Sequence, residues 1–292
     1  MRLLWIVLIA LMSPLLSAGE RIKVLASFSI LADITRNIGG SHVELTSIVG
    51  PDGDAHVYEP TPDDARRVLD ADLIIENGLH FEPWLERLRA STDSQAPVVR
   101  ASQGVIARTI REGEAESPDP HAWNNLANGK IYASNIGNAL EQADPANAEH
   151  YRRNLAAYLQ DLDDLLIETR ARFEAVPAGS RRVVTSHDAF GYLGQAYGID
   201  FVAPQGMSTE HEPSAREVAD LIALIRREHI TAVFIENIKD PRLLQQIASE
   251  AGAKIGGTLY SDALAGSGPA RTYLGLYRHN VETITQALAA DE

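Results

Sequence analysis

A helical pattern of about 30 residues is the feature that most limits how this chain can fold. After Pro145 the apolar residues recur at helical spacing as far as Phe173, with no glycine or proline before Pro177. Asp144 is placed to be the N-cap and Pro145 the first helical residue. A helix of that size would be about 45 Å long, which exceeds one small domain. We therefore expect it to connect two lobes.

Short apolar runs alternate with helical patterns on both sides of this helix, which is typical of a parallel sheet covered by helices. The expected strands are 22–27, 42–49, 72–76, 181–185, 201–204, 231–236 and 254–259. The expected helices are 30–38, 62–69, 83–88, 189–197, 214–228, 241–251 and 273–289. The sequence predicts an α/β protein of two lobes (20–143 and 177–292), each a mainly parallel sheet flanked by helices, joined by one long rigid helix (144–176). A ligand cleft would lie between the lobes.

The N-terminus has the pattern of a secretory signal peptide. Arg2 precedes an uncharged apolar stretch from Leu3 to Leu16, and small residues follow at 17–19. A membrane anchor is the alternative, but a span needs about 20 apolar residues, and Pro14 interrupts this shorter run. We expect residues 1–19 to be removed and the mature protein to lie in the periplasm.

Cysteine is absent from the 292 residues, which limits the chemistry of an exported chain. Disulfides and a lipid on cysteine are excluded, so we expect a soluble mature protein held together by its core. A transition-metal site would have to use imidazole and carboxylate groups. The net charge of −14 argues against nucleic acid as a partner, because phosphates would be repelled.

Four metal-ligating side chains lie in loops next to the expected elements, where α/β folds place their ligands. They are His56 in the turn-rich loop 50–62, His121 in the loop 119–123, His187 at the end of strand 181–185, and Asp262 after strand 254–259. Three imidazoles and one carboxylate suit a four-coordinate, borderline-soft ion, and zinc fits best. The ion would bridge the two lobes.

Other interpretations of these residues remain open at this point. His56 could be a surface-loop histidine, and His121 could pack against Trp123. Asp262 could cap a following turn. No local motif such as His-x-x-x-His supports the assignment.

The position of His187 favours a functional role, since Asp188 or Ser186 could orient its imidazole. We interpret the remaining histidines as structural or solvent-facing, with His80 and His211 as the first alternatives if the choice of ligands is wrong. They are His42, His80, His150, His211, His229 and His279.

Several longer motifs surround the four residues. They are Gly53-Asp54-Ala55-His56-Val57-Tyr58-Glu59-Pro60, Asn77-Gly78-Leu79 with Trp84 following, Asp119-Pro120-His121-Ala122-Trp123, Ser186-His187-Asp188-Ala189-Phe190-Gly191-Tyr192, Phe234-Ile235-Glu236, and Asp262 followed by Tyr273 and Asn280. With them the chain resembles, over nearly all of its mature length, the cluster A-I substrate-binding proteins of zinc and manganese ABC importers, of the ZnuA, TroA and AztC kind.

This resemblance implies a periplasmic solute-binding protein of a high-affinity zinc importer. It would bind one Zn²⁺ between its lobes through His56, His121, His187 and Asp262, and deliver the ion to an ABC permease and its ATPase. Manganese-type members carry glutamate where this chain has His187, and nitrogen ligands favour zinc over manganese. A manganese-binding or mixed-metal importer component is the alternative.

The segment from Ala107 to Pro118 is a short acidic loop without histidine, whereas many zinc-type relatives carry a long histidine-rich loop there. Loose capture of zinc is therefore doubtful, and a periplasmic metallochaperone could supply the ion. We expect a monomer that is not an enzyme. The rivals are a zinc hydrolase with Asp262 as base, and a structural protein whose metal only stabilises the fold.

Overall fold

The computed structural model describes residues 21–112, 115–177, 181–204, 206–210 and 212–289. The predicted signal peptide, residues 1–19, lies outside them. Among the helices of the described part, none is both long and apolar enough to cross a membrane.

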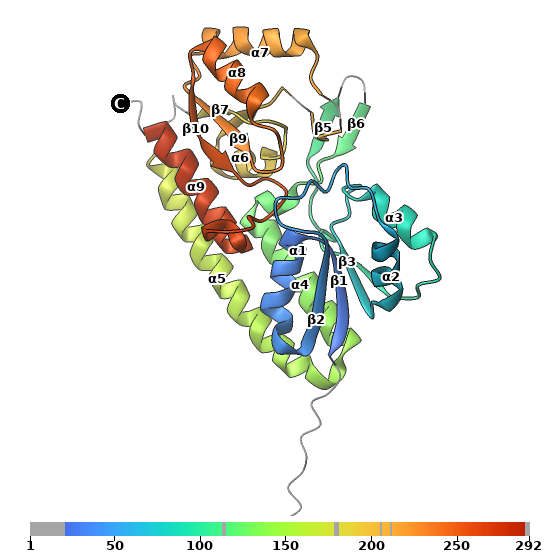
Figure 1. The fold of residues 1–292 in the computed structure, drawn as a ribbon. Coiled ribbons are helices and arrows are strands. Elements are labelled where there is room, and N and C mark those ends of the chain that lie inside the picture. The colour runs from blue at the N-terminus through green and yellow to red at the C-terminus, as the bar shows by residue number, and fades with distance from the viewer. Residues whose placement is uncertain (1–20, 113–114, 178–180, 205, 211, 290–292) are drawn as a thin grey trace, which may run out of the picture.

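The N-terminal lobe is built on a parallel four-stranded sheet of order β2-β1-β3-β4. Its strands are β1 (Ile22–Phe28), β2 (Val43–Val49), β3 (Leu73–Glu76) and β4 (Val98–Arg100). Its helices are α1 (Ser29–Gly39), α2 (Pro62–Asp70), α3 (Pro83–Ala90) and α4 (Leu126–Ala143). Helices α1 and α4 contact each other on one side of the sheet, and α2 and α3 lie on the other (Figure 1).

The C-terminal lobe repeats this architecture, with a parallel sheet of order β10-β9-β7-β8. Its strands are β7 (Arg182–Val184), β8 (Asp200–Val202), β9 (Ala232–Glu236) and β10 (Lys254–Leu259). Its helices are α6 (Gly191–Tyr197), α7 (Ala215–Arg227), α8 (Arg242–Ala251) and α9 (Tyr273–Ala289). The predicted α/β class with two parallel sheets is confirmed.

The long helix α5 (Ala148–Glu174) runs along both lobes and contacts α1 and α4 of one and α6 and α9 of the other (Figure 1). Its predicted start is wrong by three residues, because Pro145–Asn147 forms a separate 3₁₀ turn. Asp144 makes no side-chain cap to the backbone there. Its carboxylate instead accepts hydrogen bonds from the side chains of Asn147 and Tyr151, both at 2.7 Å.

The segment 107–118 is not the simple loop that was predicted, since β5 (Thr109–Glu112) and β6 (Ala115–Pro118) pair as an antiparallel hairpin. Ile110 is buried, and Thr109 and Ile110 belong to the residue types that favour strands. The buried Ile110 and the pairing of the two strands order this otherwise polar segment.

A single hydrophobic cluster extends through both lobes, from Phe28 and Trp123 to Phe190 and Tyr273. A second cluster, around Val184, Ile225 and Ile247, lies within the C-terminal lobe. The lobe boundaries at 143/144 and 176/177 remain a prediction, and the shared core crosses both of them. Continuous packing of this kind opposes large hinge opening.

The end of α5 depends on one arginine. The guanidinium of Arg181 donates to the carbonyls of Phe173 and Val176 at 2.8–3.1 Å, and to that of Tyr197 at 3.2 Å. The carbonyl of Phe173 also accepts from the N–H of Val176 at 3.1 Å, and the arginine adds charge-assisted hydrogen bonds to the carbonyls at this helix end.

We expect Arg181→Ala to lower the free energy of unfolding by about 1–3 kcal/mol, the range for charge-assisted hydrogen bonds. Arg182→Ala is the matched control, since Arg182 makes only exposed ion pairs with Asp200 and Glu228 and should change it by less than about 1 kcal/mol. Urea unfolding of both metal-free variants measures the difference. Equal midpoints would show that Arg181 does not stabilise the helix end.

Candidate metal centre

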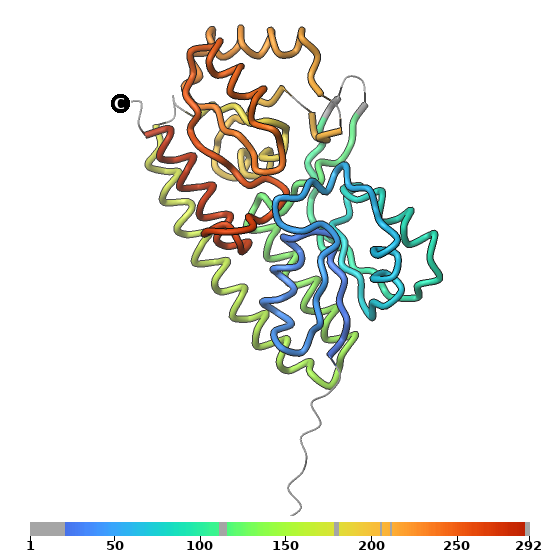
Figure 2. The backbone as a smooth tube through the Cα atoms, viewed as in Figure 1, coloured from blue at the N-terminus to red at the C-terminus, as the bar shows by residue number. Residues whose placement is uncertain are grey.

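The four predicted residues come together between the lobes. Each offers one ligand atom, and these atoms all lie within 4.8 Å of one another. His56 follows β2, His121 precedes the 3₁₀ turn Ala122–Asn124, His187 follows β7, and Asp262 follows β10. Figure 2 shows how the loops of the two lobes meet there. In parallel sheets the carboxyl ends of the strands share one edge, which is why distant residues converge.

Asp262 lies at the middle of the cluster and contacts all three imidazoles. Its Oδ2 atom is 3.2 Å from Nε2 of His56 and 3.1 Å from Nε2 of His187. Its Oδ1 atom is 3.8 Å from Nε2 of His121, and the Nε2 atoms of His56 and His121 are 3.1 Å apart. The three Nε2 atoms therefore point to one centre.

The centre is closed to solvent. The side chains of His121, His187 and Asp262 are fully buried, and that of His56 is 6% exposed. Among the described residues, neither Nε2 of His187 nor either oxygen of Asp262 has a hydrogen-bond partner of acceptable geometry. Buried polar atoms without partners are costly, and a cation at the centre would satisfy them.

Carboxylates behind two of the histidines fix their orientation. Asp119 Oδ1 lies 2.9 Å from Nδ1 of His121, and its Oδ2 is paired with Arg108 at 2.5 Å. Glu236 Oε2 lies 2.7 Å from Nδ1 of His187, which is the distance of an ion pair, and among the described residues neither atom makes a hydrogen bond of acceptable geometry. Such contacts hold a ring with its other nitrogen toward a metal.

The expectation that Asp188 or Ser186 orients His187 is wrong, because Glu236 does so. The other oxygen of Glu236 accepts hydrogen bonds from the backbone N–H groups of Ser186 and His187, at 2.7 and 3.0 Å. A charged residue that ends the apolar strand Ala232–Glu236 was the available signal in the sequence.

Aromatic side chains form the walls of the centre. The Phe81 ring packs edge-on against His56, with centroids 4.7 Å apart. Trp123 packs against His121 at 5.4 Å and donates its indole N–H to the carbonyl of Ser261, next to Asp262. His121 therefore both packs on Trp123 and belongs to the cluster, so the two interpretations of this residue from the sequence are not alternatives.

The charges of the centre act on one another strongly. Burial lowers the pKa of His56 below its ordinary value. Burial also opposes a charge on His187, but Glu236 and Asp262 outweigh it and raise the pKa of that imidazole. Although burial opposes the ionised form of Asp262, the histidines hold its pKa well below the usual range. The carboxylate of Asp262 therefore stays ionised, and its negative charge favours a cation at the centre.

The other described histidines lie elsewhere. His80 is exposed, His42 and His150 contact each other, and His279 lies 3.0 Å from the carbonyl of Thr258. His211 lies outside the described residues. In the part of the chain that the structure covers, no second group of metal-ligating side chains gathers in this way.

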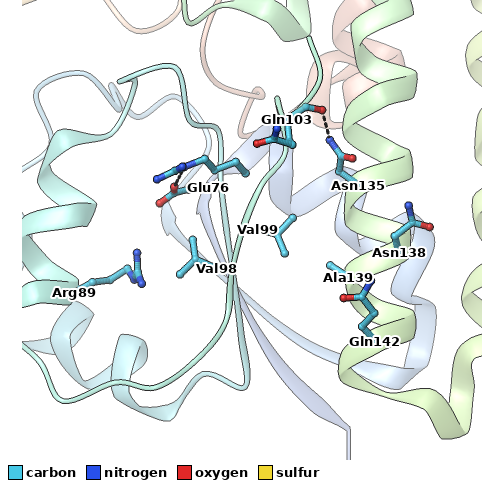
Figure 3. A pocket seen from close by; sticks show the side chains of 10 residues that line it. Glu76, Arg89, Val98, Val99, Gln103, Asn135, Asn138, Ala139 and Gln142 are labelled. Carbon is cyan, nitrogen blue, oxygen red and sulfur yellow. Dashed lines mark hydrogen bonds and ion pairs between the residues drawn. The ribbon is translucent and has the colours of Figure 1, made fainter.

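A surface pocket lies away from the centre, beside β4 and α4 (Figure 3). Its volume is about 600 Å³, and Asn135 bridges its rim by donating to the carbonyl of Gln103 at 2.9 Å. None of the four clustered residues lines it. A bare ion needs no hollow of this size, so the closed centre is the better candidate site.

Comparison with known proteins identifies the family of the chain. The family model ZnuA, described as "Zinc-uptake complex component A periplasmic", matches residues 24–287. The chain belongs to this family. Its members are substrate-binding transport proteins that work with an ABC permease and ATPase complex, and they are not enzymes. The resemblance inferred from the motifs is confirmed, and the protein is an extracytoplasmic ABC solute-binding protein for a divalent metal.

The relatives carry names with different metals. The manganese ABC transporter substrate-binding lipoprotein PsaA of Streptococcus mitis is 34% identical over 94% of this chain and 91% of its own length. The iron-binding protein YfeA of Yersinia pestis is 37% identical over 92% and 86%. The solved periplasmic zinc-binding protein TroA of Treponema pallidum is 31% identical, covers 92% of this chain and 99% of its own, and superposes with a TM-score of 0.87.

The contact behind His187 generates a test. We expect Glu236→Gln to weaken divalent-metal binding by about 10–100-fold, as losses of such supporting contacts typically do. Asp188→Asn, next in the chain to His187, should change affinity by less than about 3-fold, because Asp188 is not the residue that orients the ring. Competition with a chelator of known affinity measures both variants. The reverse order of effects would restore Asp188 as the orienting residue.

Proposed function

We propose that this protein is the periplasmic zinc-binding component of a high-affinity ABC importer. His56, His121, His187 and Asp262 would bind one Zn²⁺ between the lobes and release it to the membrane permease. The observation that carries this proposal is the set of donors: three Nε2 atoms and one carboxylate, buried and directed at one point.

The nitrogen-rich donor set supports zinc. Imidazole suits zinc, whereas manganese prefers carboxylate, carbonyl and water oxygens. The zinc-binding name of TroA agrees, while PsaA and YfeA are named for manganese and iron. A manganese or mixed-metal cargo is the second candidate, and the names of these relatives favour it.

The same donor set argues for binding without catalysis. Four protein ligands complete the coordination of zinc, whereas catalytic zinc keeps one position open for water. Asp262 contacts all three imidazoles, so it is placed as a ligand and not as a base behind them.

Delivery and supply of the ion complete the proposal. Since α5 and the shared core hold both lobes, release would come from movement of ligand-bearing loops when the permease binds. The acidic hairpin at 109–118 has no histidine, which supports loading by a metallochaperone. We also propose a monomer. Since the sequence has no cysteine, we propose that no lipid is attached to one, although PsaA is named a lipoprotein.

Replacement of a ligand tests the site directly. We expect His187→Ala to weaken zinc binding by far more than ~100-fold, because a ligand is lost and not only its support. His80→Asn is the control, since asparagine tolerates the left-handed backbone of His80 (φ 63°). Chelator competition measures both. A large loss at His80 with a small one at His187 would show that the ligands were chosen wrongly.

Metal preference tests the choice of zinc. We expect the wild type to bind zinc more tightly than manganese, and His187→Glu combined with Glu236→Gln to reduce that ratio at least about tenfold, because oxygen replaces nitrogen at the ion. The second change avoids two carboxylates in contact. Separate titrations with each metal give the ratio. The same ratio in both proteins would remove the basis for zinc selectivity at this position.

A further inference from the structure

Asp52 links the two lobes four residues before His56. Its carboxylate accepts hydrogen bonds from the Nδ2 of Asn237 and from the backbone N–H of Gly266, each at 2.9 Å. Its own N–H donates to the carbonyl of Leu264 at 2.8 Å. Asp52 belongs to the N-terminal lobe and all three partners belong to the C-terminal lobe.

These partners adjoin the residues that build the metal centre. Asn237 directly follows Glu236, which contacts His187. Leu264 and Gly266 follow Asp262 by two and four residues. One aspartate thus ties the His56 loop to the loops that carry or orient the two C-terminal ligands.

Asp52 occupies a tight turn. Its φ of 58° lies in the left-handed region, which aspartate tolerates better than most residues, and the N–H of Gly53 closes the turn by donating to the carbonyl of Gly50 at 3.2 Å. The turn places the Asp52 carboxylate against the C-terminal lobe. The approach to Gly266 is also close, because a Cβ atom there would lie 3.0 Å from the Asp52 carboxylate.

His56 is the ligand whose movement would open the centre. Its side chain is the only one of the four that is partly exposed, whereas the other three are fully buried. An ion that leaves the site would first lose the ligand nearest to solvent, so the contacts that hold this loop determine how readily it moves.

We propose that Asp52 is a positioning residue that clasps the His56 loop to the C-terminal lobe and slows release of the bound metal. The clasp consists of Asp52 with its partners Asn237, Leu264 and Gly266. This inference rests on the proposed ligand set. It adds a kinetic role for a residue that does not touch the ion.

The Asp52→Gly variant isolates the carboxylate. Glycine adopts a positive φ freely, so the backbone and its hydrogen bond to Leu264 can be kept. Asp54 still links the loop to Thr209 at 2.6 Å, so the loop stays attached at a second point. In a stopped-flow experiment with an excess of chelator, we expect Asp52→Gly to release zinc about 3–10 times faster than the wild type. This ratio corresponds to the loss of one or two exposed hydrogen bonds.

The partner and a charge control complete the test. Asn237→Ala should accelerate release in the same direction. The double variant should release zinc about as fast as Asp52→Gly, because that change already removes the contact of Asn237 with the carboxylate, and the other contact of the Asn237 amide, with the carbonyl of Ala263, is weak at 3.4 Å. Asp93→Gly removes an exposed negative charge elsewhere and should match the wild type.

Two kinetic results would overturn the clasp. One is release from Asp52→Gly at the wild-type rate, and the other is an additive double variant. If the wild type retains zinc and His187→Ala does not, either result counts against the clasp alone and leaves the ligand set standing. The free energy of unfolding of metal-free Asp52→Gly is the third measurement. If it falls by as much as the free energy that corresponds to the faster release, Asp52 has a merely structural role.

Discussion

The contact of one buried carboxylate with three buried imidazoles is the constraint on which the rest of this structure depends. Asp262 lies between three histidines from three separate loops of both lobes, and only His56 among these four side chains is slightly exposed, at 6%. Removing ionisable groups from water is costly unless they find partners. Glu236 and Asp119 hold two of the rings from outside, so that the unpaired atoms face inward. The folded chain concentrates unsatisfied donor atoms at one point, which is what a tight cation site requires.

The same requirement explains why the lobes are joined so firmly. A centre shared by two lobes keeps its geometry only if they stay in register, and α5 together with the common core around Trp123 and Tyr273 ensures this. Because α5 and the common core hold the two lobes together as one frame, uptake and release of an ion would require movement of the loops. Loops carry fewer packed contacts than helices and strands, so they open at lower free-energy cost. Under the proposed function, frame and loops would have separate tasks: the frame would fix where the ion lies, and the loops would control when it leaves.

Periodicity in the sequence predicted most of the secondary structure, since buried strands and amphipathic helices leave strong patterns. The prediction failed where a contact that the local sequence pattern does not show determines the structure. Strand β4 has three residues on a sheet edge, and Asp144 bonds to Asn147 and Tyr151 instead of capping α5. Three of the four clustered residues were found from their positions after expected strands and His121 from its loop before an expected helix, and the family resemblance supported the set. Glu236 was missed as the partner of His187 because the two are 49 residues apart and only the fold joins them.

Metal identity is a finer property than the fold that presents the metal. Relatives of 31–37% identity carry names with zinc, manganese or iron, and one of them superposes over nearly its whole length. A backbone common to these proteins cannot by itself discriminate among ions of the same charge, so the difference must lie in the donor atoms. In this chain Nδ1 of His187 lies 2.7 Å from Glu236 Oε2, so another donor at position 187 would also change the surroundings of that carboxylate. Under the proposed function, selectivity would depend on this pair, and a change of cargo would require both positions to change together.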